Sequence, residues 1–389
     1  MKPYLLRKHP GDLALPFLFL CLVALLGSPS SGRAAPSPFF KAGRLKIPRT
    51  EHTGTLLPDG RILVAGGVEA DAQTSAELYD PATRLWSKAA DLPRQRRNHT
   101  ATLLPNGKVL VVGGAIFVVD FRKADLYDPA TNLWSATGSN VVARTSAPTA
   151  TLLSDGRVLL AGGLGSNFIA VASAEIYDPV AGTWTPTGSM HVARANHTAT
   201  LLASGDVLVA GGATTGTAEI YHPSTGQWEL TGSLSESRAF HGATLLQNGS
   251  VLVAGGYNLS GGIATAELFD PARGTWQFTG SLDQARYSLT TTLLADGEVL
   301  LLGGELNDFS TIGTALLYHP ATGTWLTSSG SLHFPRAGYV TVQLPNGDVV
   351  LTGGFASRST GQSLEPSAAE GYRLRATDPV VPPATSSTQ

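Results

Sequence analysis

The strongest constraint on the fold is a unit that recurs seven times along the chain, of which residues 194–228 are one copy. Every copy begins with an arginine and continues to a pair of glycines. The arginines are Arg49, Arg96, Arg144, Arg194, Arg238, Arg286 and Arg336, and the glycine pairs lie at 66–67, 113–114, 162–163, 211–212, 255–256, 303–304 and 353–354. The pairs start 44–50 residues apart. Self-similarity at this period predicts a propeller or a solenoid, in which each unit packs mainly against its neighbours.

Each copy contains the pattern of four short strands. In the copy that follows Arg194, residues 197–202 alternate and are rich in Thr and Leu, which predicts a first strand. A Ser-Gly turn leads to residues 207–212, a continuous apolar run that is typical of a strand buried on both faces. Residues 218–221 predict a third strand, a turn containing proline follows, and Trp228 begins the fourth strand.

Six copies carry an aromatic residue before the last turn and a tryptophan seven residues later. The tryptophans are Trp86, Trp134, Trp184, Trp228, Trp276 and Trp325. A double glycine, then a tyrosine, then a tryptophan on four short strands resembles the kelch repeat, and the resemblance covers residues 35–376. It implies an all-β fold, namely a seven-bladed β-propeller of kelch repeats on a scaffold similar to the central domain of galactose oxidase.

The two ends of the repeat region complement each other. Residues 369–372 match a third strand in the seventh copy, but no tryptophan follows them. Phe39 lies ten residues before Arg49, the offset that also separates Trp86 from Arg96. We therefore expect an N-terminal outer strand to close the ring as the fourth strand of the last blade, which removes a free sheet edge. Residues 377–389 are rich in Pro, Ser and Thr and are expected to form a disordered tail.

Residues 1–34 have the features of a secretory signal peptide. A basic start precedes an apolar run from Leu13 to Leu26, which is shorter than the ~20 residues that span a bilayer. The alternative interpretation is an uncleaved membrane anchor. We expect a bacterial exported protein that is secreted, periplasmic or at the cell surface, and that has no membrane contact after cleavage. The sole cysteine, Cys21, leaves with the signal, so disulfides would not stabilise the mature chain.

The net charge and the absence of several known motifs argue against some classes of ligand. The formal net charge is −2, and removal of the basic leader would make it more negative. This charge argues against a nucleic-acid partner, which would require a basic face. The sequence contains no phosphate-binding glycine loop, no nucleophile elbow and no His-Glu-x-x-His zinc helix. We therefore expect no cofactor and no metal, and we expect a monomer.

Nearly all length variation falls in the segments between each glycine pair and the third strand. Because strands alternate in direction, these segments share a face with the arginine-bearing links, opposite the tight Asn-Gly and Asp-Pro turns. We call it the variable-loop face. Diverse loops on a uniform scaffold are where binding sites usually lie. Its candidate ligand-binding residues are Tyr257, Glu305, Asp308 and Phe309, which suit sugar stacking or a protein partner. The alternative is that these aromatic rings fold back over their own loops.

The arginines allow a structural and a functional interpretation. Six copies carry an acid in the third strand, at Glu77, Asp125, Glu175, Glu219, Glu267 and Glu370. A pair that repeats in nearly every blade indicates that the arginine and the acid hold the blades together. The alternative is a ring that attracts an anion, with Arg194, Arg238, Arg286 and Arg336 as ligands. The histidines three residues after the arginine, His52, His99, His197 and His241, are either packing residues or metal ligands.

The resemblance to kelch proteins implies several activities. Galactose oxidase and its relatives are copper-radical enzymes that need a tyrosine cross-linked to a cysteine, so we reject that activity for a mature chain without cysteine. Other exported kelch proteins are sialic acid mutarotases that use charged residues in the propeller funnel. Our hypothesis is an exported binding or interaction scaffold that recognises a glycan or a protein on the variable-loop face. The alternative is a carbohydrate-active epimerase or mutarotase.

Overall fold

The computed structural model describes residues 37–68, 72–114, 121–356 and 367–373. The chain divides into two compact units, residues 1–36 and residues 37–389, and every described residue belongs to the second unit. The predicted signal peptide 1–34 and the predicted tail 377–389 lie outside the described residues. The part of the chain that is described is all-β, and it contains no helix that could cross a membrane.

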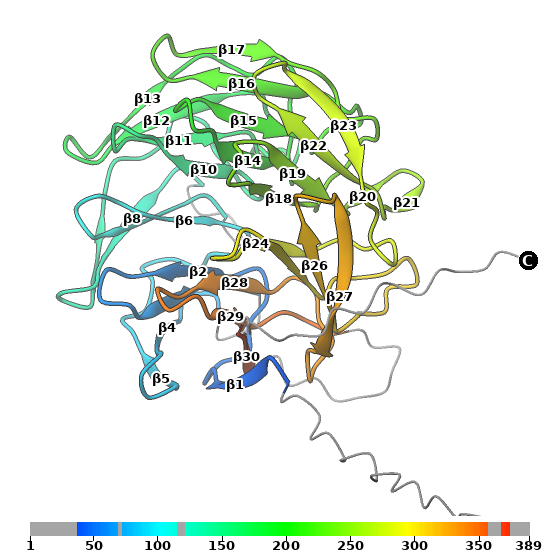
Figure 1. Cartoon of the computed structure of the whole chain (residues 1–389). Helices are drawn as coiled ribbons and strands as arrows, with labels where there is room; N and C mark the ends of the chain where they lie inside the picture. Colours follow the sequence, from blue (N-terminus) through cyan, green and yellow to red (C-terminus); the bar gives the residue numbers. More distant parts are fainter. Residues whose placement is uncertain (1–36, 69–71, 115–120, 357–366, 374–389) are drawn as a thin grey trace, which may run out of the picture. The chain divides into compact units, whose positions relative to one another are not determined.

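The strands form seven antiparallel sheets of four strands each, which confirms the predicted fold (Figure 1). Blade 1 is β2 (Thr53–Leu56), β3 (Ile62–Ala65), β4 (Ala76–Asp80) and β5 (Leu85–Lys88); blade 2 is β6 (Thr100–Leu103), β7 (Val109–Val112), β8 (Ala124–Asp128) and β9 (Leu133–Ala136). Blade 3 is β10 (Thr149–Leu152), β11 (Val158–Ala161), β12 (Ala174–Asp178) and β13 (Thr183–Pro186); blade 4 is β14 (Thr198–Leu201), β15 (Val207–Ala210), β16 (Ala218–His222) and β17 (Gln227–Leu230). Blade 5 is β18 (Gly242–Leu245), β19 (Val251–Ala254), β22 (Ala266–Asp270) and β23 (Thr275–Thr279); blade 6 is β24 (Thr290–Leu293), β25 (Val299–Leu302), β26 (Thr314–His319) and β27 (Thr324–Ser331). Blade 7 is β28 (Val340–Gln343), β29 (Val349–Thr352), β30 (Ala368–Tyr372) and β1 (Phe39–Arg44).

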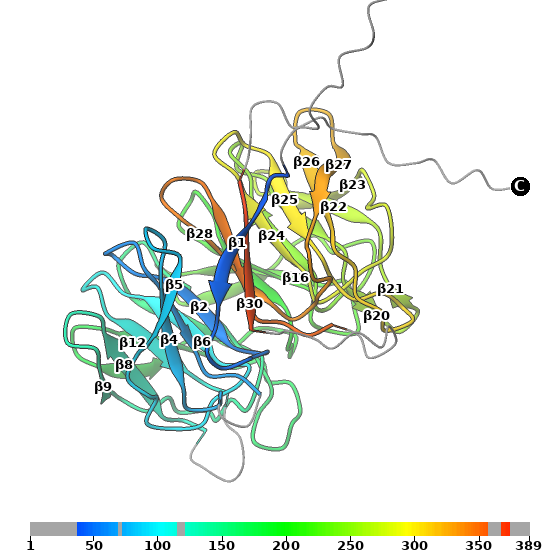
Figure 2. The same cartoon turned by 90° about the horizontal axis from the view of Figure 1, so that it is seen from below.

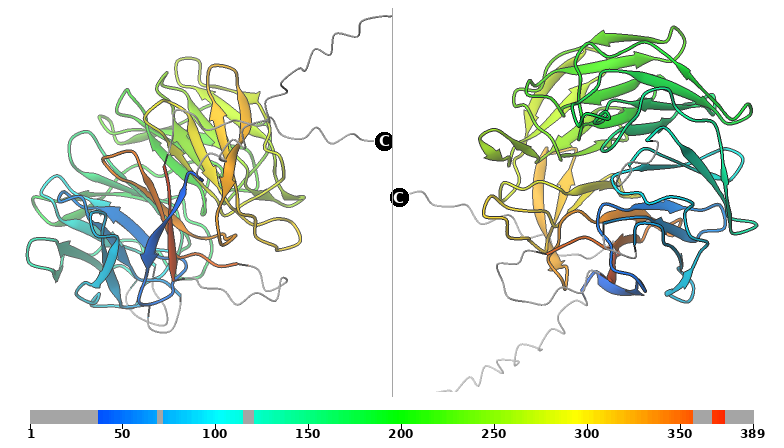
Figure 3. Two further views of the ribbon diagram at one scale, coloured as in Figure 1. Left: turned by 60° about the horizontal axis from the view of Figure 1, so that its bottom comes forward. Right: turned by 180° about the vertical axis from the view of Figure 1, so that it is seen from behind.

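The N-terminal strand closes the ring as predicted. β1 pairs antiparallel with β30, and Phe39 lies opposite Tyr372. The rings of these two residues meet edge to face with their centroids 5.2 Å apart, in the place where other blades hold a tyrosine and a tryptophan about 5.0 Å apart. Figures 2 and 3 show the blue strand β1 beside the red strand β30, although they come from opposite ends of the described chain. The first strands of successive blades contact one another, and β28 of blade 7 contacts β2 of blade 1.

The hydrophobic core is divided among the contacts between blades. Seven apolar clusters occur, and each joins residues of two successive blades. Leu110 of blade 2 packs with Leu160 and Tyr177 of blade 3, for example, and all three are fully buried. The second strand of every blade is buried at all its positions, because it lies in the middle of a sheet that is covered on both sides.

Two polar contacts repeat between neighbouring blades. The second glycine of each pair donates its amide to the carbonyl of the next blade's arginine, from Gly67 to Arg96 at 2.9 Å and finally from Gly354 to Arg49 at 3.0 Å. Each tryptophan donates its indole N–H to the preceding blade, as Trp184 does to the Gly138 carbonyl at 3.0 Å. The repeated residues therefore mark contacts between blades.

One small element was not expected from the sequence. The loop of blade 5 folds into a two-stranded ribbon of β20 (Tyr257–Asn258) and β21 (Gly261–Gly262). The ribbon lies on the variable-loop face, and Tyr257 is at its base.

Candidate functional site

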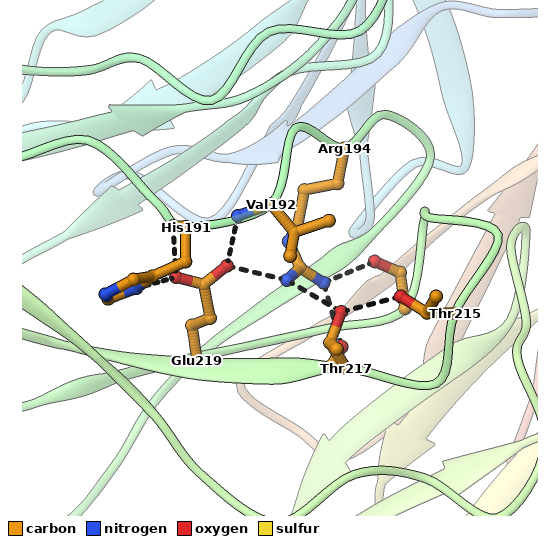
Figure 4. A network of polar contacts seen from close by, with 7 residues as sticks. His191, Val192, Arg194, Thr215, Thr217 and Glu219 are labelled. Carbon is orange, nitrogen blue, oxygen red and sulfur yellow. Dashed lines mark hydrogen bonds and ion pairs between the residues drawn. The ribbon is translucent and has the colours of Figure 1, made fainter.

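The seven repeat arginines are buried and engaged inside their own blades. In blade 4, Arg194 donates to the Gly211 carbonyl at 2.8 Å, to the Thr217 carbonyl at 2.9 Å and to Glu219 at 2.8 Å (Figure 4). Glu219 also accepts hydrogen bonds from the amides of His191 and Val192. Arg238 and Arg336 repeat this arrangement with Glu267 at 2.9 Å and Glu370 at 3.0 Å. Each pair ties the link before a blade to the third strand of that blade.

Blade 6 lacks the acid in its third strand, and its arginine pairs with a different carboxylate. Leu316 occupies the acidic position and is fully buried. Arg286 instead pairs with Asp283, three residues earlier in the chain, and donates to the Gly303 carbonyl at 3.1 Å. A carboxylate from either position meets the same need, which is to neutralise a guanidinium taken out of water.

These contacts bear on the four arginines predicted as anion ligands. Arg194, Arg238 and Arg286 are no more than 1% exposed, and Arg336 is 2% exposed. Burial lowers the pKa of each guanidinium, while the paired acids oppose that change. The anion hypothesis requires guanidiniums that are not already engaged by acids, and these four are engaged. Ligand binding by these arginines would break buried ion pairs, so we do not build a site on them.

The repeat histidines lie between blades. The His197 ring contacts a Thr149 hydroxyl of blade 3 at 2.9 Å, and the His241 ring contacts a Thr198 hydroxyl of blade 4 at 3.0 Å. Burial, together with nearby arginines, lowers the pKa of both imidazoles to about 3. Within the described ranges, no three His, Cys, Asp or Glu residues gather as ligands of one metal ion.

One residue of each blade contributes to a ring of backbone contacts on the variable-loop face, which we call the inner rim. It is formed by one residue per blade in the left-handed backbone region: Glu51, Asn98, Ala147, Asn196, Phe240, Ser288 and Gly338. Their backbones form hydrogen bonds from blade to blade, such as Asn98 N–H to the Glu51 carbonyl at 2.9 Å and Phe240 N–H to the Asn196 carbonyl at 3.2 Å. Among described residues, this chain of bonds is interrupted between Ala147 and Asn196 and between Gly338 and Glu51. The first gap follows the extra residue in the third repeat.

An aromatic and acidic cluster lies beside the rim at blades 5 and 6. The Tyr257 ring meets the Tyr287 ring edge to face, with centroids 5.0 Å apart. The Tyr287 hydroxyl lies close enough to the Glu305 carboxylate to interact with it. Burial and the Glu305 carboxylate raise the pKa of Tyr287 to about 12. Burial also raises the pKa of Glu305, although the Tyr287 hydroxyl opposes that shift.

Backbone contacts fix the first residue of each variable loop at this cluster. Tyr257 exchanges two hydrogen bonds of 2.9 Å with Ala239, and Glu305 exchanges bonds of 2.9 and 3.0 Å with Tyr287. The Tyr257 ring remains 41% exposed. The structure therefore brings two of the predicted site residues, Tyr257 and Glu305, together through Tyr287.

The other two predicted residues lie at the tip of the blade 6 loop. The Asp308 carboxylate accepts bonds from the Ser310 amide at 2.9 Å and the Ser310 hydroxyl at 2.6 Å, and these bonds lower its pKa. Phe309 is 68% exposed and has a φ of 62°, a conformation that costs a residue other than glycine roughly 1–2 kcal/mol. The Phe309 ring is thus presented to solvent, whereas Asp308 shapes the turn.

A cleft of about 440 Å³ opens on the variable-loop face above blade 4. The short blade 4 segment 213–217 forms its floor, between the longer segments 164–173 of blade 3 and 257–265 of blade 5. Its lining residues include Leu164, Ala170, Asn196, Thr214, Tyr257 and Asn258. The cleft therefore lies beside the first gap in the inner rim, and Tyr257 joins it to the aromatic cluster.

The match to known families agrees with this architecture. Residues 50–93, which comprise most of the first blade, match the family described as the kelch motif. The arginine, the glycine pair and the four strands also occur in the six other blades, and blades 2 to 6 carry the tryptophan as well. The chain is a kelch-repeat β-propeller.

Two solved structures are similar to this kelch propeller. One is YjhT, at 15% identity and a TM-score of 0.58, with 73% of this chain and 98% of that chain covered. The other is a fungal alcohol oxidase of the AA5 family in complex with copper, at 17% identity and a TM-score of 0.67, with 89% and 76% covered. Identities this low show a shared fold alone. No curated protein sequence matches the chain.

The residues of this kelch propeller do not fit a copper centre. The four repeat histidines, His52, His99, His197 and His241, lie at separate contacts between blades, each against a threonine hydroxyl. Imidazoles in such positions cannot converge on one ion. Cys21, the only cysteine, lies outside the described residues.

Two residues of the candidate site, Tyr287 and Asn196, were not predicted from the sequence. Tyr287 follows its arginine directly, where other repeats have Thr, Arg or Ala, so its bulk was the available signal. Phe309 was predicted, but its correspondence to Phe168, at the same offset in a loop of equal length in blade 3, was not. Asn196 had no local signal, because its place beside the cleft depends on the neighbouring blades.

Proposed function

We propose that this kelch propeller is a binding protein that recognises a neutral glycan on its variable-loop face. The observation that carries the proposal is the cleft above blade 4, which combines an exposed tyrosine ring with amide and hydroxyl groups. Sugar rings present one apolar face and a rim of hydroxyls, so they require an aromatic surface and neutral hydrogen-bonding groups together. Tyr257 supplies the first, and Asn196, Thr214 and Asn258 supply the second.

The cleft favours a neutral ligand over an anion. Among the described residues that line it, Arg238 alone is charged, and this side chain is 1% exposed and paired with Glu267. The adjoining carboxylate, Glu305, would repel an anionic sugar. We therefore place a neutral sugar ring on Tyr257, with Glu305 accepting a hydrogen bond from a sugar hydroxyl at one edge of the site.

A glycan array of neutral and acidic glycans tests the proposal. We expect saturable binding to neutral glycans, and a roughly fivefold loss of affinity in Tyr257→Ala because a stacked ring contributes on the order of 1 kcal/mol. Asn106→Ala and Asp155→Ala, in the tight turns on the opposite face, should bind like the unaltered protein. Binding restricted to acidic glycans, or sensitive only to the tight-turn changes, would overturn the proposal.

One observation supports a second candidate, a carbohydrate epimerase or mutarotase. The pKa of Glu305 is raised by burial, and its carboxylate contacts the Tyr287 hydroxyl. A carboxyl group with a raised pKa beside an exposed aromatic ring suits proton transfer to a sugar hydroxyl. Anomer exchange of free sugars, followed by NMR, tests this candidate. Acceleration that disappears in Glu305→Gln would support it, and exchange at the uncatalysed rate would exclude it.

We also propose that the protein acts outside the cytoplasm. The proposal rests on the basic start and short apolar run of residues 1–34. Determination of the N-terminus of the protein isolated from its natural source tests it. A first residue of Ala35 is expected, whereas an N-terminus at Met1 would contradict cleavage.

A further inference from the structure

Blades 3 and 6 carry the same exposed phenylalanine turn. Phe168 donates its amide to the Gly165 carbonyl at 2.9 Å, and Phe309 donates to the Leu306 carbonyl at 3.0 Å. The two residues have φ values of 60° and 62° and are 69% and 68% exposed. Neither turn needs a phenylalanine, because glycine or asparagine adopts this backbone with less strain. An outward-facing ring that is built twice at a conformational cost indicates contact with a ligand.

Both turns border the proposed glycan site. The Phe168 loop supplies Leu164 and Ala170 to one wall of the cleft. The Phe309 loop contacts the opposite side of the cleft, because the Gly262 amide of the β20–β21 ribbon that carries Tyr257 donates a 2.5 Å hydrogen bond to the side-chain oxygen Oδ1 of Asn307. Exposed aromatic rings therefore follow an arc over four successive blades: Phe168 on blade 3, the cleft over blade 4, Tyr257 on blade 5 and Phe309 on blade 6.

The charge along this arc matches a neutral ligand. The loops 164–173 and 257–265 contain no Asp, Glu, Lys or Arg. In loop 305–314, Asp308 is engaged with Ser310, and Glu305 contacts Tyr287. Phe168 lies on the loop of blade 3 and Phe309 on the loop of blade 6, and the cleft lies between the Phe168 loop and Tyr257. A ligand that contacts all three rings therefore spans several blades, which requires a chain of sugars rather than a single one.

We propose that the ligand is an extended neutral glycan chain that runs along this arc, with Tyr257 as the central stacking position and Phe168 and Phe309 as the outer ones. The proposal rests on the glycan-binding function proposed above and adds the length and direction of the ligand. It predicts that affinity depends on chain length, because short fragments reach the central ring alone and longer chains also reach the outer rings.

Calorimetric titration with ladders of linear oligosaccharides tests the proposal. The probes are oligomers of glucose, xylose, mannose and N-acetylglucosamine, each from the monosaccharide to the octasaccharide. For at least one ladder, the affinity of the unaltered protein should rise with length. Phe168→Ala and Phe309→Ala should each reduce octasaccharide affinity about three- to tenfold and leave disaccharide affinity unchanged.

Matched variants separate ring stacking from other effects. Phe168→Leu and Phe309→Leu keep an apolar side chain and should lose as much affinity as the alanine variants, whereas Phe→Trp at either position should retain it. Phe278→Ala removes an exposed ring on the outer strand β23 and should change nothing. All these side chains are more than half exposed, so the variants should fold, which circular dichroism and melting temperature verify.

The experiments distinguish failure of the extended-chain proposal from failure of the glycan-binding function. Binding that is independent of chain length, or unaffected by both Phe168→Ala and Phe309→Ala, overturns the extended-chain proposal and leaves the glycan-binding function in place. Absence of binding to every ladder, together with no binding to neutral glycans on the array, overturns both.

Discussion

At the residue scale, the glycine pair and the histidine of the next blade form one packing unit. A Cβ on Gly211 would lie 2.4 Å from the Arg238 carbonyl oxygen and 2.6 Å from the His241 ring. Gly212, with a φ of 71°, donates its amide to that same carbonyl. Where the histidine is replaced, another side chain covers the glycine, as Leu289 does at Gly255. The histidine is therefore one of several side chains that fit this position.

Buried histidines should make the protein sensitive to acid. Burial lowers the pKa of His99, His197 and His241 to about 3, so between about pH 6.5 and pH 3 the unfolded chain binds protons that the folded chain does not. Each such group removes about 1.4 kcal/mol of unfolding free energy per pH unit as the pH falls through that window. His197→Leu places a leucine where blade 6 has Leu289. Between pH 6.5 and pH 5, the unfolding free energy of this variant should therefore fall by about 2 kcal/mol less than that of the unaltered protein.

Urea unfolding at both pH values measures this difference. His222→Leu, at a surface ring that contacts Asp206 and Glu229, is the control for the substitution itself. An identical pH dependence in the unaltered protein and His197→Leu would show that this imidazole does not control acid stability.

The ion pairs of blades 5 and 6 allow a rescue experiment. Glu267→Leu leaves Arg238 buried without its main partner and should cost about 3–5 kcal/mol in urea unfolding. Ser235 occupies the position in blade 5 that Asp283 occupies in blade 6. The double variant Glu267→Leu/Ser235→Asp recreates the blade 6 arrangement and should recover most of the loss. Ser235→Asp that gives no recovery in the Glu267→Leu background would mean that Asp283 does not replace the missing acid.

At the element scale, the acid that links the second and third strands of a blade can lie on either strand. At the start of the second strand and the end of the third, blade 2 pairs Lys108 with Asp128 at 3.1 Å. Blade 4 inverts the pair, with Asp206 and His222 at 3.0 Å, and blade 7 also inverts it, with Asp348 and Arg373. Complementary polar groups face each other across the strands in these three blades, whichever strand carries the acid, and the sequence of one blade alone does not indicate this.

The strand β1 should be essential for the ring. It covers β30, its Ala42 carbonyl accepts the Trp86 indole N–H at 2.9 Å, and the amides of Lys46 and Ile47, which follow it, bind Glu77 of blade 1. Deletion of residues 35–46 would expose a sheet edge and remove these contacts. We expect a melting temperature lower by ten degrees or more, on the order of several kcal/mol.

Complementation provides the control for this deletion. A peptide of residues 37–46 added to the truncated protein should restore the melting temperature, because strand addition to an open sheet edge is favourable. A peptide of the same composition in scrambled order should not. An unchanged melting temperature after deletion would contradict closure by β1.

At the scale of the whole molecule, the sequence predicted the fold well and the site only in part. The seven repeats predicted the number of blades, and the offset between Phe39 and Arg49 predicted that the N-terminal strand closes the ring. Both features depend on spacing along the chain. The cleft depends instead on which loops become neighbours after the ring closes. Asn196 lies near Tyr257 only because blade 4 has a short loop, and Glu305 and Tyr257 meet only through Tyr287. The repeat arginines were predicted with a structural and a functional interpretation, and their burial favours the structural one.

A structure of the protein with a bound neutral oligosaccharide tests the central claim most directly. Crystals are to be soaked with the octasaccharide that binds most tightly, and the position of the sugar chain is to be compared between the two faces. We predict a sugar ring stacked on Tyr257 in the cleft lined by Asn196, Thr214 and Asn258, with the chain extending towards Phe168 and Phe309. A sugar chain bound at the tight turns around Asn106 and Asp155 would contradict the account.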